Sequence, residues 1–189
     1  MTQQGKNAID LVLAESLIEL SAKKPIDKIT IKEITDKAGV IRPTFYNHFQ
    51  DKYELIEWII KSELLEPIKP LLNAGMIFEA IVLMLNNISA NSVFYKKALK
   101  LEGAVTFNQI AMKCVCEMFM NIISEKSTGK KSKYRWLTPE VISTYYAQSL
   151  CFITEGWIAH GMDDIEPKEM AEAYMYLITR SMDDILSEL

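Results

Sequence analysis

The chain has 189 residues, of which 49% are apolar and 24% are charged, so it is long enough for one sizeable domain or two small ones and too apolar to be disordered. It holds no apolar run of about 18 residues, and its N-terminus lacks the basic and apolar regions of a secretory signal. We therefore expect a globular, cytoplasmic protein that does not span a membrane.

Three cysteines are too few, and odd in number, for a disulfide framework. Cys114 and Cys116 are two residues apart within an expected helix and would point in different directions, which is poor geometry for a metal pair. The two histidines, His48 and His160, lie far apart, and the chain has no P-loop, nucleophile elbow, zinc-protease motif or dinucleotide-binding glycine loop. We therefore expect no metal, no cofactor and no enzymatic activity.

The first two expected helices carry clear boundary signals. The first covers about residues 6–21, with apolar residues at helical spacing. Thr30 and Glu33 fit a capping box, in which each side chain satisfies a free N–H at the start of the second helix. Gly39 follows at the position where a helix commonly ends in a left-handed residue.

A third, short helix is expected over about residues 42–49. Pro43 lies in its first turn, where a missing N–H costs little. Phe45 and Phe49, four residues apart, would attach the helix to a small core, since a helix this short is not stable alone. The residues on or near its other face are Arg42, Thr44, Tyr46, Asn47 and His48. Residues 51–54 form a second capping box that begins a fourth helix.

Two short helices around a glycine turn, the second presenting hydrogen-bond donors, are typical of the helix-turn-helix that enters the DNA major groove. At this point the chain resembles the TetR family of bacterial transcription regulators. The matching residues, in the family's order and spacing, are Thr30, Ile34, Ala38, Gly39, Thr44, Phe45, Tyr46, His48, Phe49, Lys52 and Leu55. The resemblance implies an all-α protein with an N-terminal three-helix helix-turn-helix DNA-binding domain and a C-terminal helical domain for ligand binding and dimerisation.

Carried over by position, the resemblance implies eight candidate DNA contacts: Thr30, Arg42, Pro43, Thr44, Tyr46, Asn47, His48 and Lys52. Arg42 either pairs with a guanine or clamps a phosphate. His48 either donates to a phosphate or is bonded locally at the helix end. Thr30 and Lys52 lie at helix starts, where the dipole favours phosphate, although Thr30 also serves as a cap.

One position departs from the family's pattern. Ile41 stands where a Ser or Thr often caps the recognition helix, and Ile cannot cap. Pro43 also disfavours helical geometry at Arg42. We therefore expect this helix to start one residue late, which affects the role of Arg42.

The net charge of -4 is unusual for a DNA-binding protein. Residues 1–62 carry nine Lys or Arg and nine Asp or Glu, whereas residues 63–189 carry twelve and sixteen. Attraction to phosphate must therefore come from local placement of cations and from helix N-termini. The cations expected to attract phosphate are Lys23, Lys24, Lys28, Lys32, Lys37, Arg42 and Lys52.

We expect residues 1–52 to form the DNA-binding domain and residues 53–189 to form a helical effector-binding and dimerisation domain. A helix from about residue 51 to 66 crosses this division and is disturbed by Pro67 and Pro70. Further helices are expected over about residues 76–89, 93–101, 106–124, 139–160 and 167 to the C-terminus. The basic segment at 127–133 is expected to be a surface loop.

Parts of the C-terminal half resemble a TetR subgroup that includes activators of dihydroxyacetone kinase operons. The segments that carry this resemblance are residues 94–97, 145–147 and 155–162. TetR relatives dimerise through their last two long helices, which would close a four-helix bundle and suit a palindromic operator. The apolar residues expected on the exposed faces of these helices are Tyr145, Leu150, Ile153, Trp157, Tyr174, Leu177, Ile178, Met182 and Ile185.

The middle helices are expected to enclose a ligand cavity, although a Met and aromatic stripe is more often plain core. The candidate lining is Met76, Phe78, Met84, Phe107, Met112, Met118, Phe119 and Trp157. No polar cluster identifies a ligand, so the effector and its binding residues stay open.

The sequence thus predicts a TetR-type regulator that binds double-stranded DNA as a homodimer. The leading hypothesis is a repressor that an unknown small-molecule effector releases from, or tunes on, its palindromic operator. The alternative is a transcriptional activator or co-regulator whose acidic C-terminal half binds a partner protein. The lysines of the basic segment, Lys130, Lys131 and Lys133, are compatible with that alternative.

Overall fold

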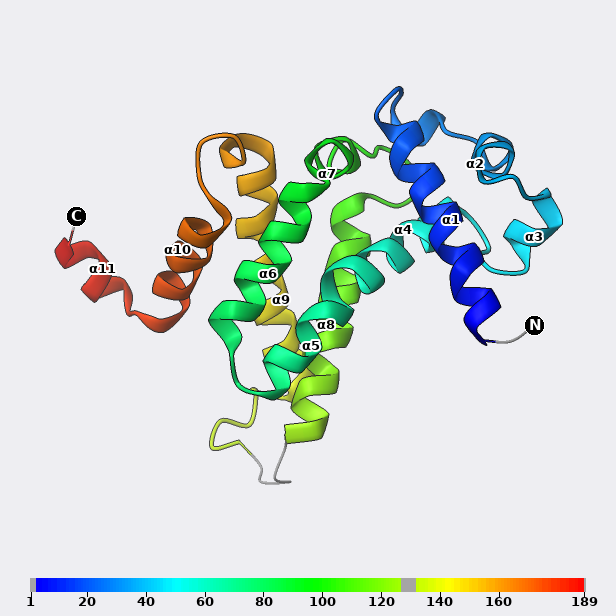
Figure 1. Ribbon diagram of the computed structural model, residues 1–189. Coiled ribbons are helices and arrows are strands. Elements are labelled where there is room, and N and C mark those ends of the chain that lie inside the picture. Colours follow the sequence, from blue (N-terminus) through cyan, green and yellow to red (C-terminus); the bar gives the residue numbers. More distant parts are fainter. Residues whose placement is uncertain (1–2, 127–131, 189) are drawn as a thin grey trace.

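The computed structural model describes residues 3–126 and 132–188, and every regular element in these two ranges is helical. The prediction of an all-α protein is therefore confirmed. Figure 1 shows the first three helices at one end of the molecule, α5, α6, α8 and α9 in the middle, and α10 and α11 at the other end. Most of the basic segment predicted to be a loop lies outside the described residues.

The N-terminal end is a three-helix unit with a short 3₁₀ turn between its first two helices. Its elements are α1 (Gln3–Ser21), η1 (Ile26–Lys28), α2 (Ile31–Ala38) and α3 (Arg42–Tyr46). Each element contributes at least one fully buried side chain to a shared core: Leu13, Leu17, Ile26, Ile34 and Phe45. A helix as short as α3 is marginal in isolation, so this core supplies its stability.

The fourth helix continues past the point where it was predicted to break. Its segments are α4 (Lys52–Ile59), the π-helical turn η2 (Ile60–Leu65) and α5 (Glu66–Asn73). Pro67 has no N–H to donate to the carbonyl of Glu63, four residues earlier. The side-chain amide of Asn87, on the neighbouring α6, donates to that carbonyl over 2.8 Å. The wide turn and this bond from outside the helix together accommodate the proline.

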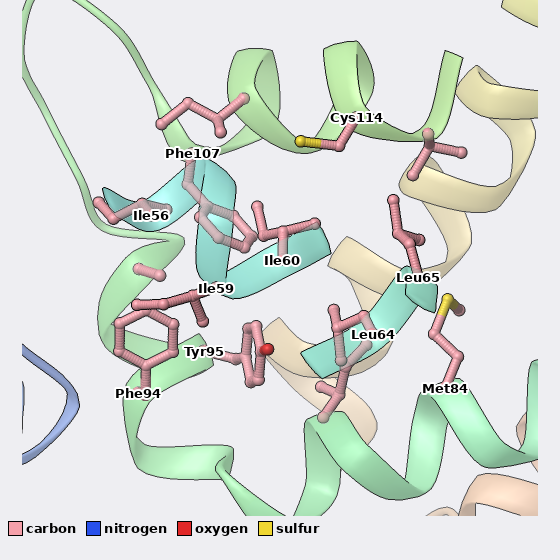
Figure 2. Close-up of a cluster of buried hydrophobic side chains, with 14 of the residues drawn as sticks. Ile56, Ile59, Ile60, Leu64, Leu65, Met84, Phe94, Tyr95, Phe107 and Cys114 are labelled. Carbon is pink, nitrogen blue, oxygen red and sulfur yellow. The ribbon is translucent and has the colours of Figure 1, made fainter. Parts of the chain in front are cut away.

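The remaining helices build the larger core. They are α6 (Ile77–Ala90), α7 (Ser92–Ala98), α8 (Phe107–Lys126), α9 (Pro139–Gly156) and a second π-helical turn, η3 (Trp157–Gly161), that extends α9. α8 packs along α9, and α6 packs against both α5 and α10. Figure 2 shows how side chains from η2, α6, α7 and α8 meet in one apolar cluster, among them Ile60, Leu64, Met84, Tyr95 and Phe107.

The last predicted helix is two helices. α10 (Pro167–Thr179) ends at Arg180, whose backbone is extended with φ -109° and ψ 152°. A second helix, α11 (Met182–Glu188), begins directly afterwards. Ser181 and Asp184 form a capping box, since the Asp184 N–H donates to Ser181 Oγ over 3.2 Å and the Ser181 N–H donates to Asp184 Oδ2 over 3.1 Å. The prediction of one continuous helix was wrong because it overlooked this local start signal.

The predicted apolar faces of α9 and α10 are only partly exposed. Leu150, Trp157 and Tyr174 are 6%, 2% and 3% exposed, so they belong to the core of the monomer and not to a free surface. This part of the prediction was wrong because α8 covers one face of α9 and α6 covers one face of α10. The large apolar side chains that stay exposed on these last helices include Tyr145, Tyr146, Phe152, Leu177, Met182 and Leu186.

Within the part of the chain that the structure describes, no single helix has the length and apolar character needed to cross a membrane. Only α6 and α7 taken together pass such a test, and an 88° bend separates them. Both helices bury apolar side chains in the core, among them Met84 and Phe94.

Replacing Asn87 with Ala should lower the free energy of unfolding by about 1–3 kcal/mol, because the Glu63 carbonyl loses its donor and Pro67 cannot replace it. Urea unfolding followed by circular dichroism measures the loss. The matched control is Asn86→Ala at the exposed neighbouring position, which should change the stability by less than about 0.5 kcal/mol. Equal losses in the two variants would mean that the bond to Glu63 contributes nothing specific.

Candidate nucleic-acid interface and buried cavity

The turn between α2 and α3 sets the position of the second helix. Gly39 has a φ of 68°, in the left-handed region that residues with a side chain rarely adopt. The next N–H, from Val40, bonds back to the carbonyl of Thr35 over 3.0 Å. The predicted role of Gly39 as the residue that ends α2 is confirmed by this geometry.

α3 presents one face to the core and the other to solvent. Phe45 and Phe49 are 0% and 4% exposed, and their ring centroids lie 5.8 Å apart. The opposite side carries the predicted DNA contacts, of which Arg42, Pro43, Tyr46 and Asn47 are exposed and Thr44 is half-buried. The structure therefore gathers five of the eight candidate residues on one accessible helix.

The start of α3 differs from the prediction. The helix begins at Arg42, with Pro43 as its second residue, and not one residue later. Ile41 gives no side-chain cap, as predicted, and its carbonyl instead accepts from the Thr44 N–H over 2.9 Å. The N–H that Pro43 lacks is one that the first turn of a helix leaves without an intrahelical partner, so the proline fits there.

Arg42 and Tyr46 form a pair on the exposed face. Arg42 Nη2 donates to Tyr46 Oη over 3.2 Å, and the guanidinium carbon lies 5.9 Å from the centroid of the Tyr46 ring. The ion pairs found among the described residues do not include Arg42. Among the described residues, Arg42 is thus a cation that Tyr46 orients and that no carboxylate pairs with.

Several other cations of the N-terminal unit have acidic partners of their own. The pairs are Lys24 with Glu33, Lys28 with Asp27, Lys32 with Asp36 and Lys37 with Glu19. Exposed pairs of this kind contribute little free energy, so phosphates can compete for these lysines. With seven Lys or Arg and six Asp or Glu in residues 3–46, the unit therefore offers cations while its net charge is only +1.

Thr30 lies at the start of α2 and is exposed. Its hydroxyl accepts from the Glu33 N–H over 3.3 Å, and its own N–H donates to Glu33 Oε2 over 2.9 Å, so the predicted capping box is confirmed. A hydrogen bond from Lys24, with those from Thr30, lowers the pKa of Glu33 to about 2. Thr30 therefore acts as a cap, and its contact with phosphate stays a prediction.

The His48 side chain is turned into the protein. It is 1% exposed, and its Nδ1 lies 2.6 Å from Oδ1 of Asp10 on α1. Asp10 is itself nearly buried, with a side chain that is 9% exposed, and a buried carboxylate needs such a partner. This bond ties the end of α3 to a helix 38 residues away, a partner that sequence spacing could not reveal. A phosphate contact by His48 stays a prediction.

Lys52 closes the turn that precedes α2. Its ammonium donates to the carbonyls of Ile26, Asp27 and Ile29 over 3.0, 2.7 and 3.2 Å. An ammonium has three N–H groups, so these bonds use all of them. Burial is the main reason that the pKa of Lys52 is lowered. The predicted phosphate contact by Lys52 stays a prediction, and it would require one of these bonds to open.

A network of ion pairs joins α4 to α8. Glu57 lies 2.7 Å from Lys61 and 2.8 Å from Lys113, and Lys61 lies 2.7 Å from Glu117. Burial favours the neutral form of Glu57, but hydrogen bonds from Lys113 and Lys61 outweigh it and hold the pKa of Glu57 below its ordinary value. A sliding motion of α8 along α4 would have to break these bonds.

The C-terminal half contains a small cavity of about 50 Å³ between η2, α6, α7, α8 and α9. Of the eight residues predicted to line a cavity, Met84 and Phe107 line this one. Three others, Phe78, Met118 and Trp157, line separate pockets. The prediction missed the lining from η2 and α9, including Ile60, Leu64 and Leu150, because aliphatic residues carry no signal that separates a cavity wall from core.

Two family models match the chain. Residues 15–59 match the model described as "Bacterial regulatory proteins, tetR family". Residues 76–180 match the model described as "Transcriptional regulator C-terminal region". The first match covers the end of α1 and all of α2, α3 and α4, and the second covers the helices from α6 to α10.

The chain is also similar to individual regulators. It is 26% identical over 152 residues to the HTH-type dhaKLM operon transcriptional activator DhaS of Lactococcus lactis subsp. lactis (strain IL1403), which is 79% of each chain. The solved structure of the dihydroxyacetone kinase operon activator DhaS is 21% identical, with a TM-score of 0.63 over 90% of this chain and 93% of the other. Thermus thermophilus FadR, a TetR-family repressor in complex with lauroyl-CoA, is 15% identical, with a TM-score of 0.61 over 92% and 94%.

Removing the carboxylate of Asp10 by an Asp10→Ala change should lower the free energy of unfolding by about 1–3 kcal/mol, because the buried His48 ring loses its partner. Thermal unfolding gives the difference. Glu15→Ala, at an exposed position of the same helix, serves as the control and should leave stability nearly unchanged. The proposed anchoring of α3 would be wrong if Asp10→Ala were no less stable than Glu15→Ala.

The low pKa of Glu33 predicts how the contribution of the capping box depends on pH. Because this pKa is lowered in the folded state to about 2, the stabilisation is present above the ordinary value near 4.5 and is lost as the pH falls through about 2. The wild-type protein should therefore be more stable than Glu33→Gln at pH 7, and this advantage should shrink between pH 4.5 and 2. Thermal unfolding of both proteins across this range measures it, and a difference that does not depend on pH would contradict the assignment.

Proposed function

Because the chain belongs to the TetR family of transcriptional regulators, we propose that it binds a palindromic operator as a homodimer and that a small-molecule effector in its C-terminal half controls this binding. Regulators of this family bind DNA and ligands and form dimers. The proposal places the protein in the cytoplasm, where operator DNA is available. It divides the chain into a DNA-binding domain of residues 1–52 and an effector-binding and dimerisation domain of residues 53–189.

The exposed face of α3 is the observation that carries the proposal. Arg42, Tyr46 and Asn47 stand on it, and Phe45 and Phe49 hold the opposite face in the core. A short helix fixed in this way can enter the major groove with its first residues toward the base edges. We propose that Arg42 reads a guanine and that Tyr46, which already holds the guanidinium, contacts a phosphate.

Thr30, Pro43, Thr44, His48 and Lys52 complete the proposed surface in different ways. Thr30 and Thr44 offer hydroxyls, and Pro43 fixes the helix start beside Arg42. The inward bonds of His48 and Lys52 favour a positioning role for both, in which they hold α3 and the preceding turn in place for the residues that touch DNA.

The exposed apolar side chains of the last helices support the dimer. Tyr145 and Phe152 on α9, with Leu177 on α10, are 65%, 75% and 47% exposed. Side chains of this size gain free energy when a second copy covers them. Two chains related by a two-fold axis would then present two copies of α3 to successive major grooves.

We propose repression as the sign of regulation, with activation as the alternative. FadR of Thermus thermophilus is by its title a repressor, whereas the DhaS of Lactococcus lactis is by its name an activator. A co-regulator that binds a partner protein is the second candidate function. The small volume of the cavity favours it over any large effector, and the exposed Tyr145 and Phe152 would then belong to the partner's surface.

Titration of the purified protein with the DNA upstream of its own gene, at two salt concentrations, tests the proposal. Wild-type binding should saturate and weaken with salt. Arg42→Ala should cost about 1–3 kcal/mol of binding free energy and relax the sequence preference at one position. A phosphate clamp at Arg42 would instead weaken all sequences alike and reduce the salt slope by about one.

The matched control is Arg135→Ala, which removes an exposed arginine from the segment that precedes α9, far from α3. It should bind DNA like the wild type. Binding that is weak, indifferent to sequence and unaffected by Arg42→Ala would contradict direct operator recognition and would favour the partner-protein function.

A further inference from the structure

The cavity in the C-terminal half contains a polar atom that the protein leaves unpaired. The Tyr95 side chain is 0% exposed, and its hydroxyl has no hydrogen-bond partner. Figure 2 shows this oxygen pointing into the space between Ile60 and Leu64, two residues of the cavity wall. Burial, with a smaller effect of the Glu63 carboxylate, raises the pKa of Tyr95, so the hydroxyl keeps its proton and is available as a donor.

A second unpaired hydroxyl lines the same cavity. Thr154 Oγ1 is buried and has no partner, although a threonine inside a helix can usually bond to the carbonyl four residues earlier. Buried polar groups are almost always hydrogen-bonded, and one that is left unpaired costs free energy. The two hydroxyls come from different helices, α7 and α9, and line one cavity of about 50 Å³. Their unpaired state indicates that the cavity receives a molecule that can form hydrogen bonds.

The charges around the cavity decide the ionisation state of that molecule. The carboxylate of Glu155 also lines it and already accepts from Asn108 Nδ2 over 2.5 Å. The Cys151 thiol on the wall is neutral, since burial raises its pKa to about 12. The wall has no Lys, Arg or His, so an anion would find no counter-charge there. Burying an unpaired charge is very costly, which excludes an anion. The Glu155 carboxylate is already engaged by the Asn108 amide, so the occupant that suits the two unpaired hydroxyls is neutral.

The volume of the cavity limits the size of the molecule that it can hold. A water molecule needs about 10–15 Å³ of such space, so a cavity of about 50 Å³ takes more than a single water. It is far smaller than the roughly 300–1,000 Å³ of a site for a drug-sized ligand. The remaining wall is aliphatic and aromatic, with Leu64, Met84 and Phe107 facing the carbon skeleton of the occupant.

We propose that the effector of this protein is a neutral, short-chain alcohol or carbonyl compound whose oxygen bonds to the hydroxyls of Tyr95 and Thr154. This inference rests on the proposed function, because it names the chemical class of the effector for the cavity of the C-terminal half. Tyr95 donates to the ligand oxygen, and Thr154 donates or accepts according to whether the ligand is a ketone or an alcohol. The aliphatic wall excludes water from the rest of the ligand.

The position of the cavity also allows a bound ligand to affect the DNA-binding unit. Ile60, Leu64 and Leu65 on its wall belong to η2, the continuation of α4. α4 packs against α1 of the DNA-binding unit. A ligand that moves η2 away from Tyr95 therefore acts on the same continuous helix that packs against α1.

Methyl NMR of the full-length protein tests the ligand class. The probes are 2-butanone and 2-butanol as neutral compounds, and propionate and propylammonium as ions of similar size. The neutral probes should shift the signals of Met84 and Leu64 in a saturable way. The two ions should leave these signals unchanged at the same concentrations. Saturable shifts with propionate or with propylammonium in place of the neutral probes would overturn the proposal.

Two shape-preserving variants test the hydroxyls. Tyr95→Phe and Thr154→Val should each weaken the binding of 2-butanone by about tenfold, the size expected when one hydrogen bond to a small ligand is lost. Each should also keep or raise the midpoint of thermal unfolding, because an unpaired buried hydroxyl has been removed. A hydroxyl with a structural role would instead give a lower midpoint. The matched control is Tyr174→Phe, a buried tyrosine outside the cavity, which should bind 2-butanone like the wild type.

The outcomes separate this inference from the proposed function. Unchanged affinity for 2-butanone in both Tyr95→Phe and Thr154→Val would overturn the assigned roles. Absence of any shift with the neutral probes, while the same preparation binds its upstream DNA in a saturable way, would overturn the ligand class and leave the regulator intact. Saturable binding of the probes without any DNA binding would support the ligand class and contradict the proposed function.

Discussion

The dependence of α3 on its anchors is the constraint on which the rest of the structure rests. Five helical residues cannot hold themselves together in water, yet they must present a rigid face. Phe45 and Phe49 fix one side of this helix by burial, and the bond between His48 and Asp10 fixes its end to α1. The three-helix unit can be read as a frame whose purpose is to position Arg42 and Tyr46. A substitution at one of these anchoring residues should therefore affect DNA binding even though it leaves the exposed face of α3 unaltered.

The same frame is continuous with the C-terminal half. Lys52, the first residue of α4, holds the carbonyls of the turn before α2, and Glu57 near the end of α4 is bonded to Lys113 on α8. The helix then widens into η2, whose side chains form part of the cavity wall. Coupling between two sites needs an element that both sites can bias. The continuous helix from Lys52 to Leu65 meets that requirement, because its two ends contact the DNA-binding unit and the cavity.

The sequence predicted the N-terminal unit well because its signals are local. The capping box of Thr30 and Glu33, the left-handed Gly39 and the spacing of Phe45 and Phe49 each act within a few residues. The partners of His48 and Lys52 could not be predicted in this way, since they lie 38 and 23 to 26 residues away. The burial of Leu150, Trp157 and Tyr174 was missed because packing between helices decides which apolar face is covered. Only the break before α11 had a local signal, at Ser181 and Asp184, that the sequence analysis overlooked.

The charge balance of the chain affects how such a protein can be controlled. The N-terminal unit has a net charge of only +1, and most of its lysines are paired with carboxylates. In the proposed function, the long-range, sequence-independent attraction to DNA is therefore weak, and affinity would depend on a few aligned contacts around Arg42. Aligned contacts are lost when the spacing of two recognition helices changes, whereas a diffuse attraction would survive that change. In the proposed function, a weak background attraction would thus let a small movement of α4 switch binding.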